Sequence, residues 1–390
     1  MNMAKNWAKL NPDFLVEICR RIKLYEYFVA FRGVCFSWRS ATIEETFTNK
    51  DSQMPWLMLV AKKCTNLRDF FSISKGMRRQ VTLPYQVNGS TCLSSKGWLI
   101  AIWQALSMKL VHPFSGAEIK LSHIKSFSHW QNLQTRKIYT SFIRKYALSS
   151  NPLSSSDFTL MVIHGSIGLL AYSRRGDKVW TTIETWYSRY SDIIYYEGQF
   201  YALDYCNSRI MACDVGGDDP TVAQQDANMP YELIIKYFGK LYLVESEGEF
   251  LVLSREMGEP STIQERRHNS SYATLKFHVF KVDLSTNTWT KIKELGNRAL
   301  LLGNSTSIFV EASYNSFCKS NYIYFTDDNG ETYRHEGDGG GTYLGIYNFE
   351  DGSITPYFKG NISCNRLTPP IWVEQKVSIK GFLKKKKLWI

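Results

Sequence analysis

The sequence lacks the patterns that mark several large classes of protein. No stretch approaches the roughly 18 to 20 apolar residues needed to cross a bilayer. The first residues hold no apolar core of the kind found in a secretory signal. None of the eight cysteines forms a CxxC pair. We therefore expect no membrane association, reduced cysteines, and a protein of the nucleus, the cytoplasm or both.

Catalytic and metal-binding patterns are also missing. The seven histidines show no HxH or HxxxH spacing, so no metal site is predicted and the histidines are expected at the surface or in turns. No G-x-S-x-G sequence is present. The glycines at 337–341 lack the preceding strand, the following helix and the Lys-Ser/Thr ending of a phosphate loop. The sequence thus predicts no cofactor and no catalytic residue.

About half of the excess of basic residues lies in the last 15 residues of the chain, so the excess elsewhere is modest. The chain has 47 basic and 36 acidic residues, a net charge of +11. Residues 376–390 contribute six lysines and no acid, so the other 375 residues carry only +5. This charge is weak evidence for nucleic acid, and no nucleic-acid partner is expected. The basic run in this tail is either a nuclear-import signal or a solvated end, and comprises Lys384, Lys385, Lys386 and Lys387.

Residues 1–48 have the period of short helices. Apolar residues recur on one helical face at Phe14, Leu15, Ile18 and Ile22. Asn11 is expected to cap this helix, with Pro12 at its first position. A second helix is predicted over 25–34, interrupted at Gly33, and a third with Ser37 as its N-cap. Such a module is near the lower size limit for an independent core, so it is expected to pack on a partner.

Residues 91–375 have the pattern of short strands and turns, after a segment over 49–90 that connects and begins the same domain. One recurring phrase is a glycine followed by a strand, as at Gly97, Gly198 and Gly239, the last two 41 residues apart. A second phrase is a strand, a polar turn and a strand, and it occurs at 110–119, 171–180, 279–289 and 346–354. Units of about 40–50 residues predict a β-propeller of about six blades, within a range of five to seven. The polar segments 258–271 and 329–341 are expected to be loops.

The first helical residues carry a specific resemblance. Residues 7–18 and 31–40 resemble an F-box, whose pattern runs Leu-Pro-x-Asp-Leu-Leu-x-x-Ile and then Arg-x-Val-Cys-x-x-Trp-Arg. The second half matches at every signature position, namely Arg32, Val34, Cys35, Trp38 and Arg39. The first half departs from the pattern, because Leu10-Asn11 replaces Leu-Pro and Phe14 stands where Leu is usual.

The rest of the chain resembles plant F-box proteins with a C-terminal kelch-like propeller. The phrases that carry this resemblance are LLAYSRRGDKVW (169–180), IIYYEGQFYALD (193–204), YIYFTDD (322–328) and PPIWV (369–373). The expected fold class is therefore mainly β, with a small three-helix module at the N-terminus that resembles an F-box, followed by the β-propeller. The resemblance implies a non-catalytic substrate receptor of a Skp–cullin–F-box ubiquitin ligase. Its partners would be a Skp-type adaptor, through it a cullin, and a target protein that the sequence does not identify.

The resemblance also assigns an adaptor-binding surface to the helical module. The candidate residues are Leu10, Pro12, Phe14, Leu15, Ile18, Ile22, Val34, Cys35 and Trp38. Some of them must form the core of the module itself, and the sequence does not sort them. Arg32 and Arg39 are either contacts at the rim of this surface or solvated charges, and the solvated state is favoured. Replacing Leu15 and Ile18 with Asp is expected to abolish adaptor capture and leave the propeller folded.

Two other functions remain open. If the departure at Asn11 weakens adaptor binding, the chain is an adaptor-independent binding propeller. A propeller enzyme would instead need carboxylates that converge, and the candidates end strands at Asp204, Glu245, Asp327 and Asp328. Aspartate is common in turns, so turn formation is the favoured role of these residues.

Overall fold

The structure of the protein is a computed structural model. The residues that it describes are 7, 10–22, 31–42, 54–59, 66–73, 76–83, 92–102, 107–128, 142–184, 187–231, 233, 239–258, 273–312, 318–328, 344–355 and 369–374. The chain divides between Met54 and Pro55 into a helical unit and a strand unit that runs to Val377. The described residues include no helix that is long and apolar enough to cross a membrane.

The helical unit confirms the predicted cap of the first helix. Helix α1 spans Pro12–Arg20, and the Asn11 side chain accepts a hydrogen bond from the Asp13 amide at 2.8 Å. Residues 31–33 are helical, and the helix ends at Gly33, where an interruption is predicted; residues 25–30 of the predicted second helix lie outside the described residues. Helix α3 spans Phe36–Ala41 and has Cys35, in extended conformation, as its N-cap. The prediction of Ser37 as this N-cap is wrong, because Ser37 already lies within the helix.

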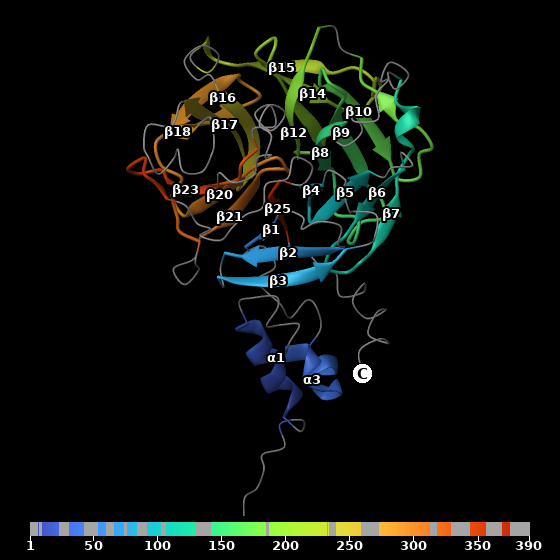
Figure 1. Ribbon diagram of the computed structural model, residues 1–390, viewed down its shortest axis with the longest axis vertical. Helices are drawn as coiled ribbons and strands as arrows, with labels where there is room; N and C mark the ends of the chain where they lie inside the picture. Colours follow the sequence, from blue (N-terminus) through green and yellow to red (C-terminus); the bar gives the residue numbers. More distant parts are fainter. Residues whose placement is uncertain are drawn as a thin grey trace, which may run out of the picture. The chain divides into compact units, whose positions relative to one another are not determined.

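The strand unit is a propeller of six sheets, here called blades 1 to 6 in chain order (Figure 1). Blade 1 consists of β25 (Ile371–Val373), β1 (Trp56–Met58), β2 (Leu67–Ser72) and β3 (Met77–Thr82). Blade 2 consists of β4 (Leu93–Ser95), β5 (Trp98–Ile102), β6 (Met108–Val111) and β7 (Glu118–Lys120), followed by the short helix η4 (Ile124–Ser126). Blade 3 consists of β8 (Ile143–Leu148), β9 (Thr159–His164), β10 (Leu169–Arg174) and β11 (Thr181–Thr182).

The other three blades complete the ring. Blade 4 consists of β12 (Tyr190–Tyr196), β13 (Gln199–Asp204), β14 (Arg209–Cys213) and β15 (Gln224–Asn228). Blade 5 consists of β16 (Gly239–Ser246), β17 (Glu249–Gly258), β18 (Ala273–Asp283) and β19 (Thr288–Ile292). Blade 6 consists of β20 (Arg298–Leu302), β21 (Ile308–Glu311), β22 (Tyr322–Phe325), β23 (Gly345–Asn348) and β24 (Ile354–Thr355). The six-bladed propeller predicted from the repeat length is confirmed.

The two recurring phrases differ in how they map onto the blades. The strand–turn–strand phrase always covers the outer hairpin of a blade, at β6–β7, β10–β11, β18–β19 and β23–β24. The glycine phrase mixes two positions. Gly97 and Gly198 lie in turns between the first and second strands, but Gly239 is in a first strand. The glycine of blade 5 that corresponds to Gly198 is Gly248, 50 residues later.

Three of the hairpins between the first and second strands of a blade, here called inner hairpins, use the same tight turn; one is the turn of Lys96 and Gly97 in blade 2, with φ of +48° and +81°. Glu197 and Gly198 both have positive φ, +43° and +93°, and they join β12 to β13 with two residues. Glu247 and Gly248 repeat the arrangement between β16 and β17, with φ of +54° and +77°. Paired positive φ values define the mirror-image turn that matches strand twist, and glycine adopts it without steric cost. The same turn therefore recurs at one end of neighbouring blades.

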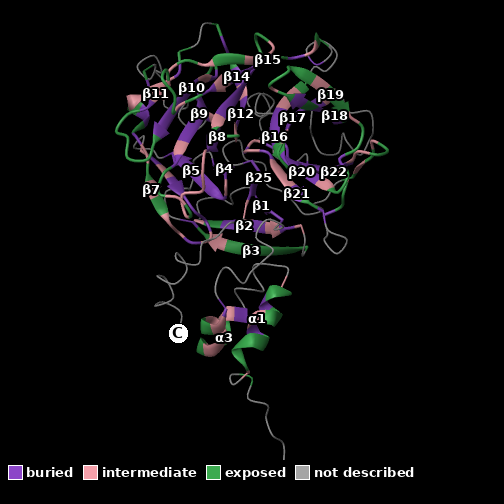
Figure 2. Ribbon diagram, turned by 180° about the vertical axis from the view of Figure 1, so that it is seen from behind, coloured by how far each residue is buried: buried purple, intermediate pink, exposed green. Residues whose placement is uncertain are grey.

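Blade 1 closes the ring by joining distant parts of the chain. β1 pairs antiparallel with β2 on one side and with β25 on the other, so Leu57 lies opposite Trp372. All six residues of β1 and β25 are buried. Burial is concentrated in the inner and middle strands of the blades, shown in purple in Figure 2. The ring is therefore closed by strand pairing and by apolar packing together.

Blade 6 departs from the simple meander. It has five strands in the order β21-β20-β22-β23-β24, and β20 runs parallel to β22. The connection from β20 to β21 reaches other blades. The Thr306 hydroxyl donates to the carbonyls of Ser94, in β4, and Tyr146, in β8, at 3.2 Å each. This connection therefore ties blade 6 to blades 2 and 3.

Buried ion pairs connect neighbouring blades. Lys145 of β8 lies 2.9 Å from the Asp192 carboxylate in β12, and that carboxylate also accepts from the Leu243 amide in β16. Asp328, which follows β22, pairs with Arg255 of β17 at 2.9 Å and with Lys240 of β16 at 2.8 Å. A buried charge is tolerated when it is paired and hydrogen-bonded. These pairs connect blade 3 with blades 4 and 5, and blade 5 with blade 6.

Candidate functional site

The helical unit exposes an unusual number of large apolar side chains. Phe36 is 81% exposed and Phe14 is 64% exposed. Ile18 and Val34 are also exposed, as is Trp7. Phe14 and Ile18 are four residues apart in α1, so they lie on one face of the helix. Apolar surface of this kind marks an interaction site when it is gathered on a small module.

The structure sorts the nine predicted contact residues by their burial. Pro12, Phe14, Ile18 and Val34 are exposed. Leu10, Ile22, Cys35 and Trp38 are half-buried. Leu15 is fully buried and, with Cys19, forms the inner side of α1. Leu15 is thus part of the core of the module, so the double replacement of Leu15 and Ile18 would unfold the helices as well as alter their surface.

The second half of the F-box pattern holds the helices together. The Trp38 ring lies 4.5 Å from the Phe31 ring, and its Nε1 donates to the Trp7 carbonyl at 2.9 Å. Arg32 and Arg39 each donate to the main-chain carbonyl of the other, at 3.5 and 3.3 Å. The expectation that these arginines are solvated is wrong, because both are half-buried and link the residues before α3 to the end of that helix.

Two exposed aromatic residues of the helical unit are not among the nine candidates, namely Trp7 and Phe36. Phe36 begins α3 directly after the Val-Cys pair, and Trp7 precedes α1. The sequence did contain a sign that Phe36 is exposed. A phenylalanine at the start of a short helix has no apolar residue one turn before it against which it could pack. Next to Phe36, the Cys35 sulfur lies 3.2 Å from the Ser37 hydroxyl, and this hydrogen bond lowers the pKa of the Cys35 thiol.

The strand-ending acids come from three different blades, Asp204 from blade 4, Glu245 from blade 5, and Asp327 and Asp328 from blade 6. Asp204 belongs to blade 4, where it accepts hydrogen bonds from Asn207 and Arg209 and shapes the β13–β14 turn, as predicted. Asp328 lies in blade 6 and is fully engaged by cations. Burial opposes its ionisation, but the charges of Lys240 and Arg255 hold the pKa of Asp328 below its ordinary value. Asp328 therefore forms an ion pair between blades. The prediction that its role is turn formation did not include this pair.

Metal chemistry finds no support in the part of the chain that the structure describes. No group of three or more His, Cys, Asp or Glu side chains is close enough there to hold an ion. The expectation of surface or turn histidines is wrong for His164 and His278, which are buried within β9 and β18. His112 is also buried, but it lies at the β6–β7 turn, where its Nδ1 accepts from the Ser115 amide. His112 and His164 pack against aromatic rings. Lys384, Lys385, Lys386 and Lys387 lie outside the described residues, as do most of the two predicted loops.

Comparison with known proteins adds a family match and a set of relatives. The family model described as the KIB1-4 beta-propeller matches residues 70–348. An Arabidopsis thaliana chain named as an F-box protein, At5g55150, is 25% identical over 366 residues, 91% of this chain and 94% of that one. The F-box protein SKIP23 of the same plant is 25% identical over 386 residues, 90% of each chain. The F-box protein At4g35733 is 24% identical and is covered over its full length.

Proposed function

This chain belongs to the KIB1-4 beta-propeller family, and from that premise we propose that it is a substrate-recognition subunit of a Skp–cullin–F-box ubiquitin ligase. The helical unit binds the Skp-type adaptor, and through it the cullin. The propeller binds the target protein. The observation that carries the proposal is the pairing of an exposed apolar surface on a helical module with a closed propeller, in a chain whose relatives are named F-box proteins.

The energetic argument for the adaptor rests on the exposed residues of the module. Burying a large apolar side chain contributes roughly 1.5–3 kcal/mol. Phe14, Ile18, Val34 and Phe36 remain available for such burial, whereas Leu15 and Cys19 are already used within the module. A partner that covers the four exposed side chains therefore gains binding energy that the module alone does not use.

The proposed mechanism is positioning, with no chemistry in this chain. A receptor that holds a target and an adaptor at once raises the effective concentration of a target lysine near the ubiquitin-loaded enzyme. The rigid six-bladed ring, with its buried ion pairs between blades, suits this role because it holds the target at a fixed place. The kelch-like character suggested by the sequence phrases stays a prediction, as does nuclear or cytoplasmic localisation.

The test is co-purification of the full chain with a Skp-type adaptor. Phe14→Glu with Ile18→Glu changes exposed residues of α1 and leaves Leu15 and Cys19 in place. The matched control is Ile167→Glu with Val179→Glu, because these side chains are also exposed but lie on the propeller. We expect capture by the unmodified chain and the control, and loss of capture by the α1 variant.

Two results would contradict the proposal. Equal capture by a folded α1 variant would remove α1 from the interface. Absence of capture by the unmodified chain would favour the second candidate, an adaptor-independent binding propeller. The specific observation behind that candidate is Asn11, whose side chain caps α1 at the position where the family pattern has proline.

A further inference from the structure

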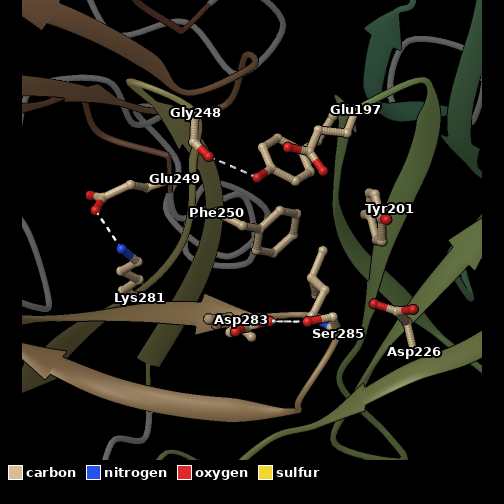
Figure 3. Close-up of a pocket in the computed structure, with 12 residues that line it drawn as sticks. Glu197, Tyr201, Asp226, Gly248, Glu249, Phe250, Lys281, Asp283 and Ser285 are labelled. Carbon is tan, nitrogen blue, oxygen red and sulfur yellow. Dashed lines mark hydrogen bonds and ion pairs between the residues drawn. The ribbon is translucent and has the colours of Figure 1, made fainter.

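A hollow of about 440 Å³ lies between blades 4 and 5. It opens beside the two matching tight turns, and its lining includes Glu197 of the first turn and Gly248 of the second. This volume falls within the range of about 300–1,000 Å³ that is usual for ligand pockets. Figure 3 shows the side chains that surround it.

Three aromatic rings form one wall of the hollow. Tyr196 and Tyr201 come from blade 4 and Phe250 from blade 5. Phe250 lies 5.2 Å from each tyrosine ring, and the tyrosines lie 6.0 Å apart, all edge to face. Tyr196 donates to the Gly248 carbonyl at 2.8 Å, which fixes its ring across the boundary between blades. The wall is therefore rigid before anything binds.

Carboxylates face the same hollow without matching cations. Asp226, in β15, is half-buried, and its Oδ2 has no hydrogen-bond partner among the residues that the structure describes. Burial raises the pKa of Asp226. Glu197 lies beside Tyr196, whose pKa is raised to about 12 by burial and then by the hydrogen bond and charge of Glu197. A buried carboxylate oxygen without a partner carries a desolvation cost that a bound cation would remove.

The single lysine of the lining is already engaged. Lys281 pairs with Glu249 at 2.7 Å, and Glu249 also pairs with Arg298 of blade 6. Figure 3 shows Glu249 and Lys281 on the other side of β17 from Phe250, as expected from alternation along a strand. Apart from this neutralised pair, the lining holds three carboxylates and no cation, so the hollow is acidic; the carboxylates are those of Glu197, Asp226 and Asp283.

We propose that this hollow binds an arginine side chain of the target protein, with the guanidinium against the tyrosine rings and hydrogen-bonded to Asp226. This inference rests on the proposed function, because it assigns the part of the propeller that recognises the target. Aromatic faces attract cations, and a planar guanidinium combines stacking with directed donation to a carboxylate. A lysine side chain is also attracted to aromatic faces, but its ammonium group is not planar and cannot stack on a ring. It should therefore bind more weakly than arginine.

The test uses the full chain and a capped pentapeptide with one central arginine between glycines. Its dissociation constant is measured by ligand-observed NMR, beside peptides in which citrulline or lysine replaces arginine. We expect arginine to bind best, lysine more weakly and the neutral citrulline peptide not at all. The Asp226→Asn variant keeps the shape of the side chain and should weaken arginine binding about tenfold or more.

A matched control separates the hollow from general charge. Glu247→Gln removes the same charge as Glu197→Gln from the same type of turn in the next blade, and Glu247 is not part of the lining. We expect Glu197→Gln to weaken arginine binding severalfold and Glu247→Gln to leave it unchanged. Circular dichroism checks that each variant stays folded.

Three outcomes would overturn the inference: no binding of the arginine peptide, equal binding of the citrulline peptide, or unchanged binding by a folded Asp226→Asn variant. The peptide measurement needs no adaptor, so its failure is distinct from failure of the adaptor test. If adaptor capture holds and arginine binding fails, target recognition lies elsewhere on the propeller. If arginine binding holds and adaptor capture fails, the chain is a basic-peptide receptor outside the ligase.

Discussion

The helical unit and the propeller differ in their phenylalanine and tryptophan side chains, because the exposed ones among the described residues all belong to the helical unit. In the helical unit, Trp7, Phe14 and Phe36 are exposed. In the propeller, Trp98, Trp372 and Tyr242 are almost completely buried, and ring contacts run through the blade boundaries. The propeller therefore supplies its own apolar environment, whereas the helical unit leaves part of that task to another molecule. A small module with a large exposed apolar surface is best understood as one side of an interface.

The same contrast holds for charge. Arg255 and Asp328 form a fully buried pair in the propeller. Arg21 and Glu17 form an exposed pair on α1, with more than half of each side chain in solvent. Exposed pairs contribute about 0–1 kcal/mol, whereas removal of one partner from a buried pair costs far more. Variants in the two units should therefore differ in what they disturb.

The largest effect is expected from Asp328→Asn in the propeller. The change leaves Arg255 and Lys240 without their shared carboxylate, and we expect the free energy of unfolding to fall by about 3–5 kcal/mol. Guanidinium denaturation followed by tryptophan fluorescence measures this change. Lys109→Gln, which removes a partly exposed ion pair with Glu118, is the control and should cost less than about 1 kcal/mol.

The dependence of this loss on pH identifies its cause. The pKa of Asp328 is lowered in the folded protein, so its stabilising contribution is present above the unfolded pKa of about 3.9 and is lost as pH falls through the folded value. The difference in stability between the unmodified chain and Asp328→Asn should therefore be constant near neutral pH and shrink below about pH 4. A difference that is unchanged down to pH 3 would contradict the ion-pair explanation.

A smaller effect, confined to the helical unit, is expected from Leu15→Ala. Truncating a fully buried leucine costs about 2–5 kcal/mol, and the small helical unit has little stability to lose. Hydrogen exchange of residues 12–20 should become much faster, while exchange in β8–β10 stays the same. Faster exchange in both regions would mean that the two units unfold together.

A still smaller effect is expected from Asn11→Ala. The side chain of Asn11 accepts from the Asp13 amide, and loss of such a cap costs about 1 kcal/mol. Exchange of the first amides of α1 should accelerate about fivefold. Asn11→Asp keeps an acceptor at the same place and serves as the control, so equal acceleration in both variants would exclude the cap as the cause.

The smallest change in stability, within about 0.5 kcal/mol, is expected from Phe36→Ser, because the ring is 81% exposed. The same variant should capture less Skp-type adaptor if Phe36 belongs to the interface. The measurement is a paired comparison of thermal unfolding and adaptor co-purification. Unchanged capture would restrict the interface to α1 and sharpen the contrast between the two units.

The repeat length and the outer hairpins were predictable from the sequence because local turn chemistry determines them. The polar turn at 283–288 and the turn at 349–353 both join the last two strands of their sheets. The sequence did not show which strand of a blade follows each glycine. A glycine before a strand occurs in the turn between the first two strands, as at Gly198, and also at the start of a first strand, as at Gly239. The five strands of blade 6 and its parallel pair depend on contacts distant in sequence.

The sequence predicted which residues belong to the candidate site. Only the structure showed which of them are exposed and which are buried in the module. Helical periodicity placed Phe14, Leu15 and Ile18 on related faces of α1, but it does not distinguish a residue that packs on its own module from one that meets a partner. The hollow between blades 4 and 5 had no sequence signal, because Tyr201, Asp226 and Phe250 come from different strands. Only the stacking of two blades brings them together.

The pairing of β1 with β25 imposes an order of events during synthesis. The helical unit and β1 leave the ribosome early, but the inner edge of β1 stays unpaired until Ile371–Val373 emerges, more than 300 residues later. Over this interval the nascent chain carries an open strand edge that invites wrong pairing. A premature stop anywhere before Ile371 makes that temporary state permanent. Such shortened chains would retain the α1 surface but lack a sealed ring, so they would occupy the adaptor without presenting a target.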